Sequence, residues 1–403
     1  MSEFTNNQKA KNDKILSFCL KILKGEKPAE AVKNNQRLID TVNFRDIITV
    51  TDNLQKLGID MEELKTGVNK FLNLFYKTLN SNNVELPSKD TFLYFLVKDN
   101  QELDKRLKAI RPLLLQYNKD NVNKTTAAKL KEAFGELTVF ENHYIIKENI
   151  IFPELEKRWD DYRCVKIMWS FHDDIRKNIK SIIRELDKKN PDPKTVNRLA
   201  GYIFFNMYAI KFREEKILFP RILETIPNEK LNAMLLESED LDWAFVSPPA
   251  TLLKRLKKGG QNIENKDVQS VDLKTGKLFP EQIRWMMNHL PVDVTYVDEN
   301  NKVRYFSTPK KRIFPRTVAV IERDVRNCHP HESVHVVEKI VEAFRKGEKD
   351  HADFWINMKG EMIYIRYFAI RDEEGNYRGV LEVSQEVTEI RKLKGEQRLL
   401  DWE

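Results

Sequence analysis

The sequence lacks the features of extracellular and membrane-embedded proteins. Its 403 residues include only three cysteines, Cys19, Cys164 and Cys328, which are odd in number and far apart. This pattern excludes a disulfide framework and a Cys-x-x-Cys motif, and it fits a reducing compartment. No apolar run reaches the roughly 18 residues of a membrane helix, and the polar N-terminus shows no hydrophobic segment of a secretory signal. We therefore expect a cytoplasmic protein that does not enter a membrane.

Catalytic and nucleic-acid motifs are also missing. The formal net charge of +7 is mild and spread along the chain, and no basic, aromatic-rich segment indicates a nucleic-acid module. Lys258-Gly259-Gly260 does not stand between a strand and a helix, as a phosphate loop requires. Neither the cysteines nor the seven histidines form a nucleophile motif. The sequence therefore favours a binding or signalling protein over an enzyme, without nucleic acid as a partner.

An internal repeat dominates the middle of the chain. The stretch His143–Pro153 (HYIIKENIIFP) returns 67 positions later as Ile210–Pro220 (IKFREEKILFP). Each copy predicts a helix that carries a glutamate, Glu148 or Glu215, followed by an apolar patch and a kink at a proline. A third helical segment between the copies carries His172. Two related helical hairpins form a four-helix bundle, and such bundles hold metals on side chains of facing helices.

Hydrophobic periodicity predicts an α+β multidomain chain. The predicted parts are a helical domain with a disordered lead at 1–14 (1–82), a four-helix bundle (83–240), a linker (241–279), a mixed α+β domain (280–396) and the end of a C-terminal helix (397–403). In the bundle, the long helices are expected at 92–118, 127–159, 165–188 and 196–225. In the α+β domain, a hairpin at the turn Asp298–Asn301 precedes a helix at Val334–Phe344, three strands and a helix at Glu389–Trp402.

Nearly the whole chain resembles one bacterial family. LPVDVTYVDENNKVRYFS, RNCHPHESVHVVEKIVEAFRKGEKD and FWINMKGEMIYIRYFAIRDEEGNYRGVLEVSQEVTEI resemble its PAS sensor domain. HYIIKENIIFPELE, MWSFHDDIR and FREEKILFP resemble its hemerythrin-like (HHE cation-binding) domain. GEKPAEAVKNNQRLIDTVNFRDIITVTDNLQKLGIDMEELKTGV resembles the helical domain of unknown function that precedes them. The resemblance implies a cation-binding bundle and a PAS domain that binds a small ligand or a protein partner.

The candidate metal ligands of the bundle are His143, Glu148, His172 and Glu215. An oxygen-carrying hemerythrin uses five histidines and two carboxylates for two irons, and this bundle offers two histidines. We therefore expect a mononuclear or carboxylate-rich site for iron or another divalent transition metal such as manganese or zinc. Two alternatives remain open: a haem held between the two histidines, and a metal-free bundle in which Lys147, Arg176 and the glutamates form ion pairs.

The PAS-like part contains two candidate cofactor residues. His335 lies on the helix after Cys328-His329-Pro330, where haem-binding PAS domains place an axial histidine. Cys328 is a candidate redox thiol if His329 or His331 lowers its pKa. The residues after Asn327-Cys328 do not match the flavin photoreceptor pattern. The alternative is that CHPHES is a structural turn at the start of the helix, with Ser333 near its first turn.

These observations predict a cytoplasmic sensor or signalling protein that responds to redox state, a metal or a diatomic gas. One alternative is a non-haem iron redox enzyme that handles oxygen, peroxide or nitric oxide. Another is a cofactor-free interaction scaffold. Because PAS domains often pair through their flanking helices, a homodimer is expected by analogy.

Overall fold

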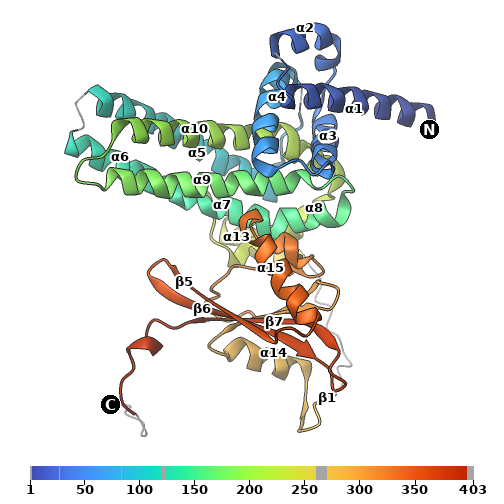
Figure 1. Ribbon diagram of the computed structural model, residues 1–403, viewed down its shortest axis with the longest axis vertical. Helices are drawn as coiled ribbons and strands as arrows, with labels where there is room; N and C mark the ends of the chain where they lie inside the picture. Colours follow the sequence, from blue (N-terminus) through green and yellow to red (C-terminus); the bar gives the residue numbers. More distant parts are fainter. Residues whose placement is uncertain (1, 27, 83, 120–122, 260–269, 397–403) are drawn as a thin grey trace. The chain divides into compact units, whose positions relative to one another are not determined.

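A computed structural model describes residues 2–26, 28–82, 84–119, 123–259 and 270–396. The chain divides into two compact units, Met1–Gly260 and Gln261–Glu403. The first unit is helical and the second contains an antiparallel sheet, which confirms the predicted fold class (Figure 1). In the described ranges, no helix has both the length and the apolar character that crossing a membrane requires.

Four helices form the N-terminal part of the helical unit. The third begins with a capping box, in which Asn43 Oδ1 accepts from the Asp46 amide at 3.2 Å and the Asp46 carboxylate accepts from the Asn43 amide at 2.9 Å. Gly58, with φ of +70°, follows its C-terminus. The disordered lead expected at 1–14 was wrong for its described part, because α1 begins at Ser2. The same helix buries Ile15 and Phe18 further along. The helices are α1 (Ser2–Leu23), α2 (Pro28–Ile39), α3 (Phe44–Lys56) and α4 (Met61–Ser81).

The four predicted long helices of the bundle are all present, and they lie side by side (Figure 1). The first and third are continuous, whereas the second and fourth are interrupted at the repeat. In chain order they comprise α5 (Phe92–Lys119); α6 (Lys124–Glu136), η1 (Leu137–Phe140), α7 (Glu141–Ile146), η2 (Lys147–Ile151) and α8 (Phe152–Arg158); α9 (Cys164–Leu186); and α10 (Pro193–Arg213), η3 (Glu214–Leu218) and α11 (Phe219–Thr225).

Each copy of the repeat contains a turn of π-helix, η2 in the first and η3 in the second. The amide of Phe152 donates to the carbonyl of Lys147, and that of Phe219 donates to the carbonyl of Glu214, five residues back. A proline follows each phenylalanine, and its ring clashes with the preceding turn of a regular α-helix. The wider π turn relieves this clash, so the predicted kink has a defined structure. Such turns frequently occur at functional sites.

Part of the segment predicted as a linker packs on the bundle. Asp99 on α5 accepts hydrogen bonds from the amides of Phe245 and Val246 at 2.9 and 2.8 Å. The Phe245 ring stacks on Phe140, with 5.7 Å between centroids. Helix α12 (Asn228–Glu237) and η4 (Ser238–Asp240) precede this segment, and α13 (Ala250–Gly259) lies within it. Residues 260–269 of the predicted linker lie outside the described residues.

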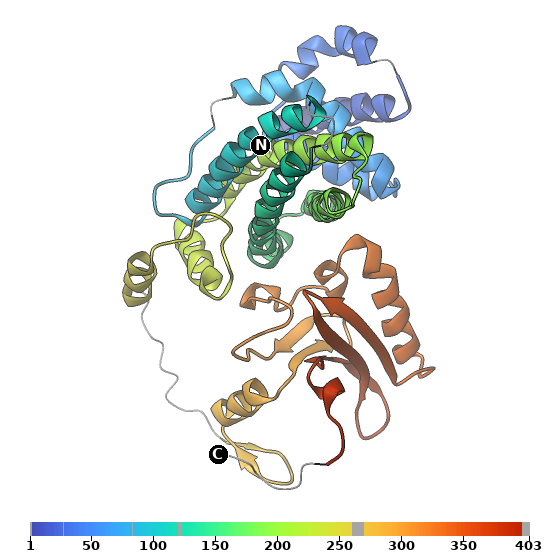
Figure 2. The same cartoon turned by 90° about the vertical axis from the view of Figure 1, so that its left-hand side faces the viewer.

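The sheet of the second unit has the strand order β4-β3-β7-β6-β5, and all neighbouring strands are antiparallel. The predicted hairpin is confirmed: the Asp298 carboxylate accepts from the amides of Asn300 and Lys302 at the turn. Helix α15 (His331–Arg345) lies across one face of the sheet, where Phe344 completes a small apolar core (Figure 2). The strands are β3 (Asp293–Asp298), β4 (Val303–Phe306), β5 (His351–Met358), β6 (Glu361–Arg371) and β7 (Tyr377–Glu386).

Short elements flank this sheet. The segment before it contains β1 (Val271–Asp272), β2 (Lys277–Leu278) and α14 (Pro280–His289), and the connection from β4 to α15 contains η5 (Val318–Val320) and η6 (Val325–Cys328). The predicted C-terminal helix at 389–402 was wrong for the described part, where only one 3-10 turn forms, η7 (Ile390–Lys392). Its predicted end, 397–403, lies outside the described residues.

Candidate functional site

Three of the four candidate ligands lie in one buried chain of polar side chains at the level of the π turns. His143 on α7, Glu148 on η2 and His172 on α9 are buried in the interior of the bundle. Glu215 is half-buried and forms no hydrogen bond or ion pair with them among the described residues. Its neighbour Glu214 is buried instead and forms an ion pair with Lys147.

The centre of this buried polar chain is an ion pair between equivalent positions of the repeat. Lys147 and Glu214 are 67 residues apart, as the two copies are. The Lys147 ammonium contacts Oε1 of Glu214, and neither side chain has exposed surface. The other oxygen of Glu214 accepts from Asn100 Nδ2 at 2.8 Å. The pair therefore joins the two π turns through the interior of the bundle.

At one end of the chain, His143 lies between two carboxylates. Its Nε2 is 3.0 Å from Oε2 of Glu214, and its Nδ1 is 3.4 Å from Oδ2 of Asp99. Both nitrogens can donate at once only in the imidazolium form. Burial by itself lowers the pKa of His143, but the negative charge of Glu214 and the hydrogen bond to Asp99 outweigh it and raise the pKa above its ordinary value. The raised pKa and the two carboxylate contacts both favour the imidazolium form of His143.

At the other end, His172 lies between a carboxylate and an ammonium. Its Nδ1 is 2.7 Å from Oε1 of Glu148, and its Nε2 is 3.0 Å from Nζ of Lys147. Burial, reinforced by the positive charges of Lys147 and Arg176, lowers the pKa of His172 well below its ordinary value. The neutral ring satisfies both contacts, because Nδ1–H donates to Glu148 and the Nε2 lone pair accepts from Lys147. Arg176 Nη2 donates to the other oxygen of Glu148 at 2.8 Å.

The residues present do not fit a metal ion in this arrangement. Nε2 of His172 and the carboxylate of Glu214 are donors that would bind a metal, and both contact the Lys147 ammonium. Among the described residues, no group of three or more His, Cys, Asp and Glu side chains is arranged to hold one. The buried polar chain joins three carboxylates to three basic side chains, which are Asp99, Glu148 and Glu214 and His143, Lys147 and Arg176.

A haem between the two histidines does not fit either. All four ring nitrogens of His143 and His172 contact charged side chains. Phe140 stacks on His143 with 4.5 Å between ring centroids, and Tyr144 stacks on His172 with 4.2 Å. An axial bond would require a free ring nitrogen and space for the porphyrin beside it.

In the PAS-like unit, the structure places neither predicted cofactor residue at the cavity beneath α15. His335 is exposed on α15. Cys328 is half-buried at the end of η6, where its Sγ lies 3.7 Å from the Asp324 carbonyl. The cavity is instead lined by the histidine between them, His329.

This cavity has a volume of about 20 Å³. Its polar lining comes from His329, Tyr367 and Glu382. Nε2 of His329 is buried and has no hydrogen-bond partner among the described residues, and burial lowers the pKa of this ring, which favours its neutral form. Glu382 is held by Arg316 at 3.4 Å. The apolar lining consists of Val297, Val325, Val337, Ile340, Val341 and Val380.

Sequence analysis did not identify Glu382 or Tyr367 as site residues. The sequence could have indicated Glu382, because it alternates with Val380 and Ser384 on the inward face of β7. A glutamate in an inward row of a strand requires a partner or a ligand. The register of β7 could not be assigned from the sequence alone.

Comparison with protein families matches residues 91–222 to the hemerythrin HHE cation binding domain and residues 283–388 to a PAS domain. The chain therefore belongs to the proteins that combine these two domains, with a helical region preceding them. No curated protein matches it. The matched family model describes a cation-binding domain, and in this chain the Lys147 side chain lies at the centre of the bundle.

Two solved structures are similar to parts of the chain. A C-terminal domain from Streptococcus mutans is 30% identical, with 32% of this chain and 98% of that chain covered and a TM-score of 0.30. A sensory box sensor histidine kinase from Vibrio cholerae is 12% identical, with 27% of this chain and 90% of that chain covered and a TM-score of 0.22.

Proposed function

We propose that the protein is a signalling protein whose stimulus is a small ligand bound beneath α15 of the PAS domain. The observation that carries this proposal is the buried, unpartnered Nε2 of His329 in an otherwise mostly apolar cavity. Ligand sites commonly combine apolar walls with a few oriented polar groups. Here His329 and Tyr367 can donate or accept a hydrogen bond, and Glu382 can accept one.

Helix α15 is suited to transmit binding as a movement. Of its residues only Phe344 is fully buried, whereas Val337, Ile340 and Val341 are half-buried above the cavity. An element with few buried contacts separates from its support at a low free-energy cost. Because about 20 Å³ admits little more than a water-sized molecule, a larger ligand would move α15 outward. The proposal also includes a downstream partner and a homodimer expected by analogy, and sedimentation of the purified chain would test the homodimer.

The proposal predicts that a bulky residue in the cavity displaces the ligand. Native mass spectrometry of the purified full chain should detect a bound small molecule in the wild type and none in Ile340→Trp. Lys339→Trp adds the same ring on the exposed side of α15 and should leave binding unchanged. A wild-type chain without any bound small molecule, or equal binding by Ile340→Trp, would contradict the proposed sensor function.

For the bundle, we propose that the Lys147 ammonium takes the place of the metal. It contacts the same donor types, imidazole and carboxylate, that a transition metal would bind. The competing proposal is an iron site that includes His143, His172 and Glu148, which the match to the HHE family favours. Such a site would require Lys147 to leave the interior.

Elemental analysis separates the two proposals. Wild-type protein purified without oxygen from metal-supplied cells should contain no stoichiometric iron, manganese or zinc. Lys147→Glu places a carboxylate beside Glu214 and His172 and should gain a divalent metal, whereas Lys147→Met supplies only a soft thioether and should gain less. Stoichiometric metal in the wild type, with loss of stability on chelation, would establish the competing proposal.

A further inference from the structure

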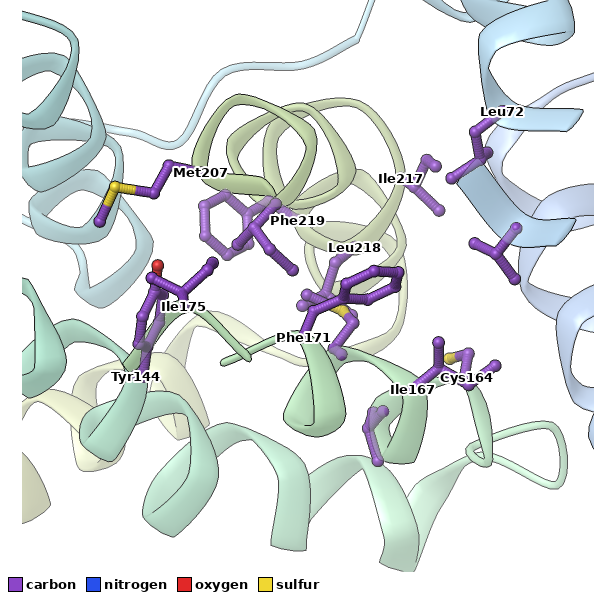
Figure 3. Packing of buried hydrophobic residues seen from close by; sticks show 14 of the residues in the cluster. Leu72, Tyr144, Cys164, Ile167, Phe171, Ile175, Met207, Ile217, Leu218 and Phe219 are labelled. Carbon is purple, nitrogen blue, oxygen red and sulfur yellow. The ribbon is translucent and has the colours of Figure 1, made fainter. Parts of the chain in front are cut away.

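A second cavity, of about 40 Å³, lies in the helical unit where α3 and α4 meet the bundle. Leu72, Cys164 and Ile217, from α4, α9 and η3, gather around it (Figure 3). Its lining is apolar except for Thr51 and Arg213. The cavity belongs neither to the PAS domain nor to the buried polar chain described above.

Arg213, the last residue of α10, is an unpaired cation in the lining of this cavity. The side chain is 5% exposed. Its Nη2 donates to Asn69, and its Cζ lies 4.2 Å from the centroid of the Phe171 ring. Nε and Nη1 are both buried, and neither has a hydrogen-bond partner among the residues that the structure describes. In the described part of the chain, no carboxylate forms an ion pair with Arg213.

Such an arrangement is costly in a folded protein. Buried charges are ordinarily paired, and buried donors ordinarily find acceptors. Burial alone lowers the pKa of Arg213 to about 9, with no anion to oppose it. By contrast, the fully buried Lys147 has the Glu214 carboxylate as its partner. The missing anion and the adjoining cavity together indicate a partner that is not part of the chain.

We propose that Arg213 anchors a small carboxylate, of the size of acetate, in this cavity. The carboxylate oxygens would accept from the guanidinium, whose planar donors match a carboxylate. The alkyl group would contact Ile48, Val68 and Leu72, which are buried. A water needs about 10–15 Å³ on this measure, so about 40 Å³ holds roughly three such groups. A phosphate or sulfate would leave oxygens facing apolar walls.

The site adjoins the buried polar chain through the backbone. Arg213 and Glu214 are consecutive, and the π turn η3 begins between them. Arg213 contacts Asn69 of α4, whereas Glu214 contacts Lys147 and His143 of the bundle. An anion at Arg213 would therefore fix the position from which η3 presents Glu214.

The test is titration of the full chain with sodium acetate at constant ionic strength, followed by calorimetry and thermal unfolding. Acetate should bind and raise the unfolding temperature, whereas sodium chloride and the neutral isostere acetamide should not. Arg213→Met should weaken acetate binding about tenfold or more, since it removes charge-assisted hydrogen bonds. Arg198→Met removes the same charge from the exposed side of α10 and should bind acetate as the wild type does.

A second variant tests the proposal even if Arg213→Met does not fold. Val68→Phe fills the cavity while Arg213 stays in place, and it should also lose the response to acetate. The proposal is overturned if the wild type does not respond to acetate, if chloride or acetamide acts equally, or if both variants keep full affinity.

Discussion

Replacing Lys147 by methionine removes the central ammonium of the bundle and keeps an unbranched side chain of similar length. Glu214 would keep its hydrogen bonds from Asn100 at 2.8 Å and from His143 at 3.0 Å. Removing one partner of a buried ion pair costs about 3–5 kcal/mol. Because two donors remain, we expect the lower end of that range, about 3 kcal/mol. In a unit of this size the loss corresponds to a decrease of about 6–12 °C in Tm.

Urea unfolding followed by far-ultraviolet circular dichroism would measure this loss. The double variant Lys147→Met/Glu214→Gln removes both charges and should recover part of the stability, because no unpaired carboxylate remains. Lys105→Met is the matched control, since Lys105 pairs with Glu102 at the surface. This variant should lower the free energy of unfolding by less than about 1 kcal/mol. The reasoning is refuted if the free energy of unfolding of Lys147→Met lies within about 0.5 kcal/mol of that of the wild type, and if Glu214→Gln has the same effect with and without Lys147→Met.

Three further predictions concern other parts of the two units. Because the folded state lowers the pKa of His172, its contribution to stability is present above about pH 6.5 and is lost as the pH falls below that value; His172→Gln should flatten this decline in thermal scans between pH 5 and 7. Asp99→Asn should lower the free energy of unfolding by about 1.5–3 kcal/mol and speed hydrogen exchange of the Phe245 and Val246 amides, which donate to Asp99. Gly379→Ala should destabilise the sheet unit alone by about 1–3 kcal/mol, measured by exchange in β7, because Gly379 has φ of +131° and a Cβ would clash with the Val297 carbonyl. Unchanged exchange in either variant would contradict the corresponding contact.

The sequence was sufficient to predict the helices of the bundle and the strands of the PAS domain. Periodicity placed the apolar faces, and the 67-residue repeat identified the two interrupted helices. It could not predict the π turns, because one extra residue in a helical turn changes the apolar pattern too little to be recognised. That extra residue decides which glutamate faces the interior, so Glu215 was selected where the structure buries Glu214.

Long-range contacts explain the remaining differences. The segment at 241–249 looked like a linker because its docking depends on Asp99, more than 140 positions earlier. In the PAS domain, His335 lies outside the face of α15 formed by Val337, Ile340 and Val341. His329 precedes the helix, and its inward direction follows from the loop and not from helical periodicity. Likewise, nothing in the sequence around Arg213 showed that it would be buried without an anion.

The central claim is that the Lys147 ammonium contacts imidazole and carboxylate donors of the kind that a metal would bind, and the protonation of His172 tests it most directly. Nitrogen-15 NMR of the histidine side chains at neutral pH, assigned with His172→Gln, distinguishes the possible states. The account predicts a neutral His172 ring that is protonated at Nδ1 and accepts a hydrogen bond at Nε2. A ring protonated at Nε2, an imidazolium, or an Nε2 signal shifted or broadened by a bound metal would contradict it.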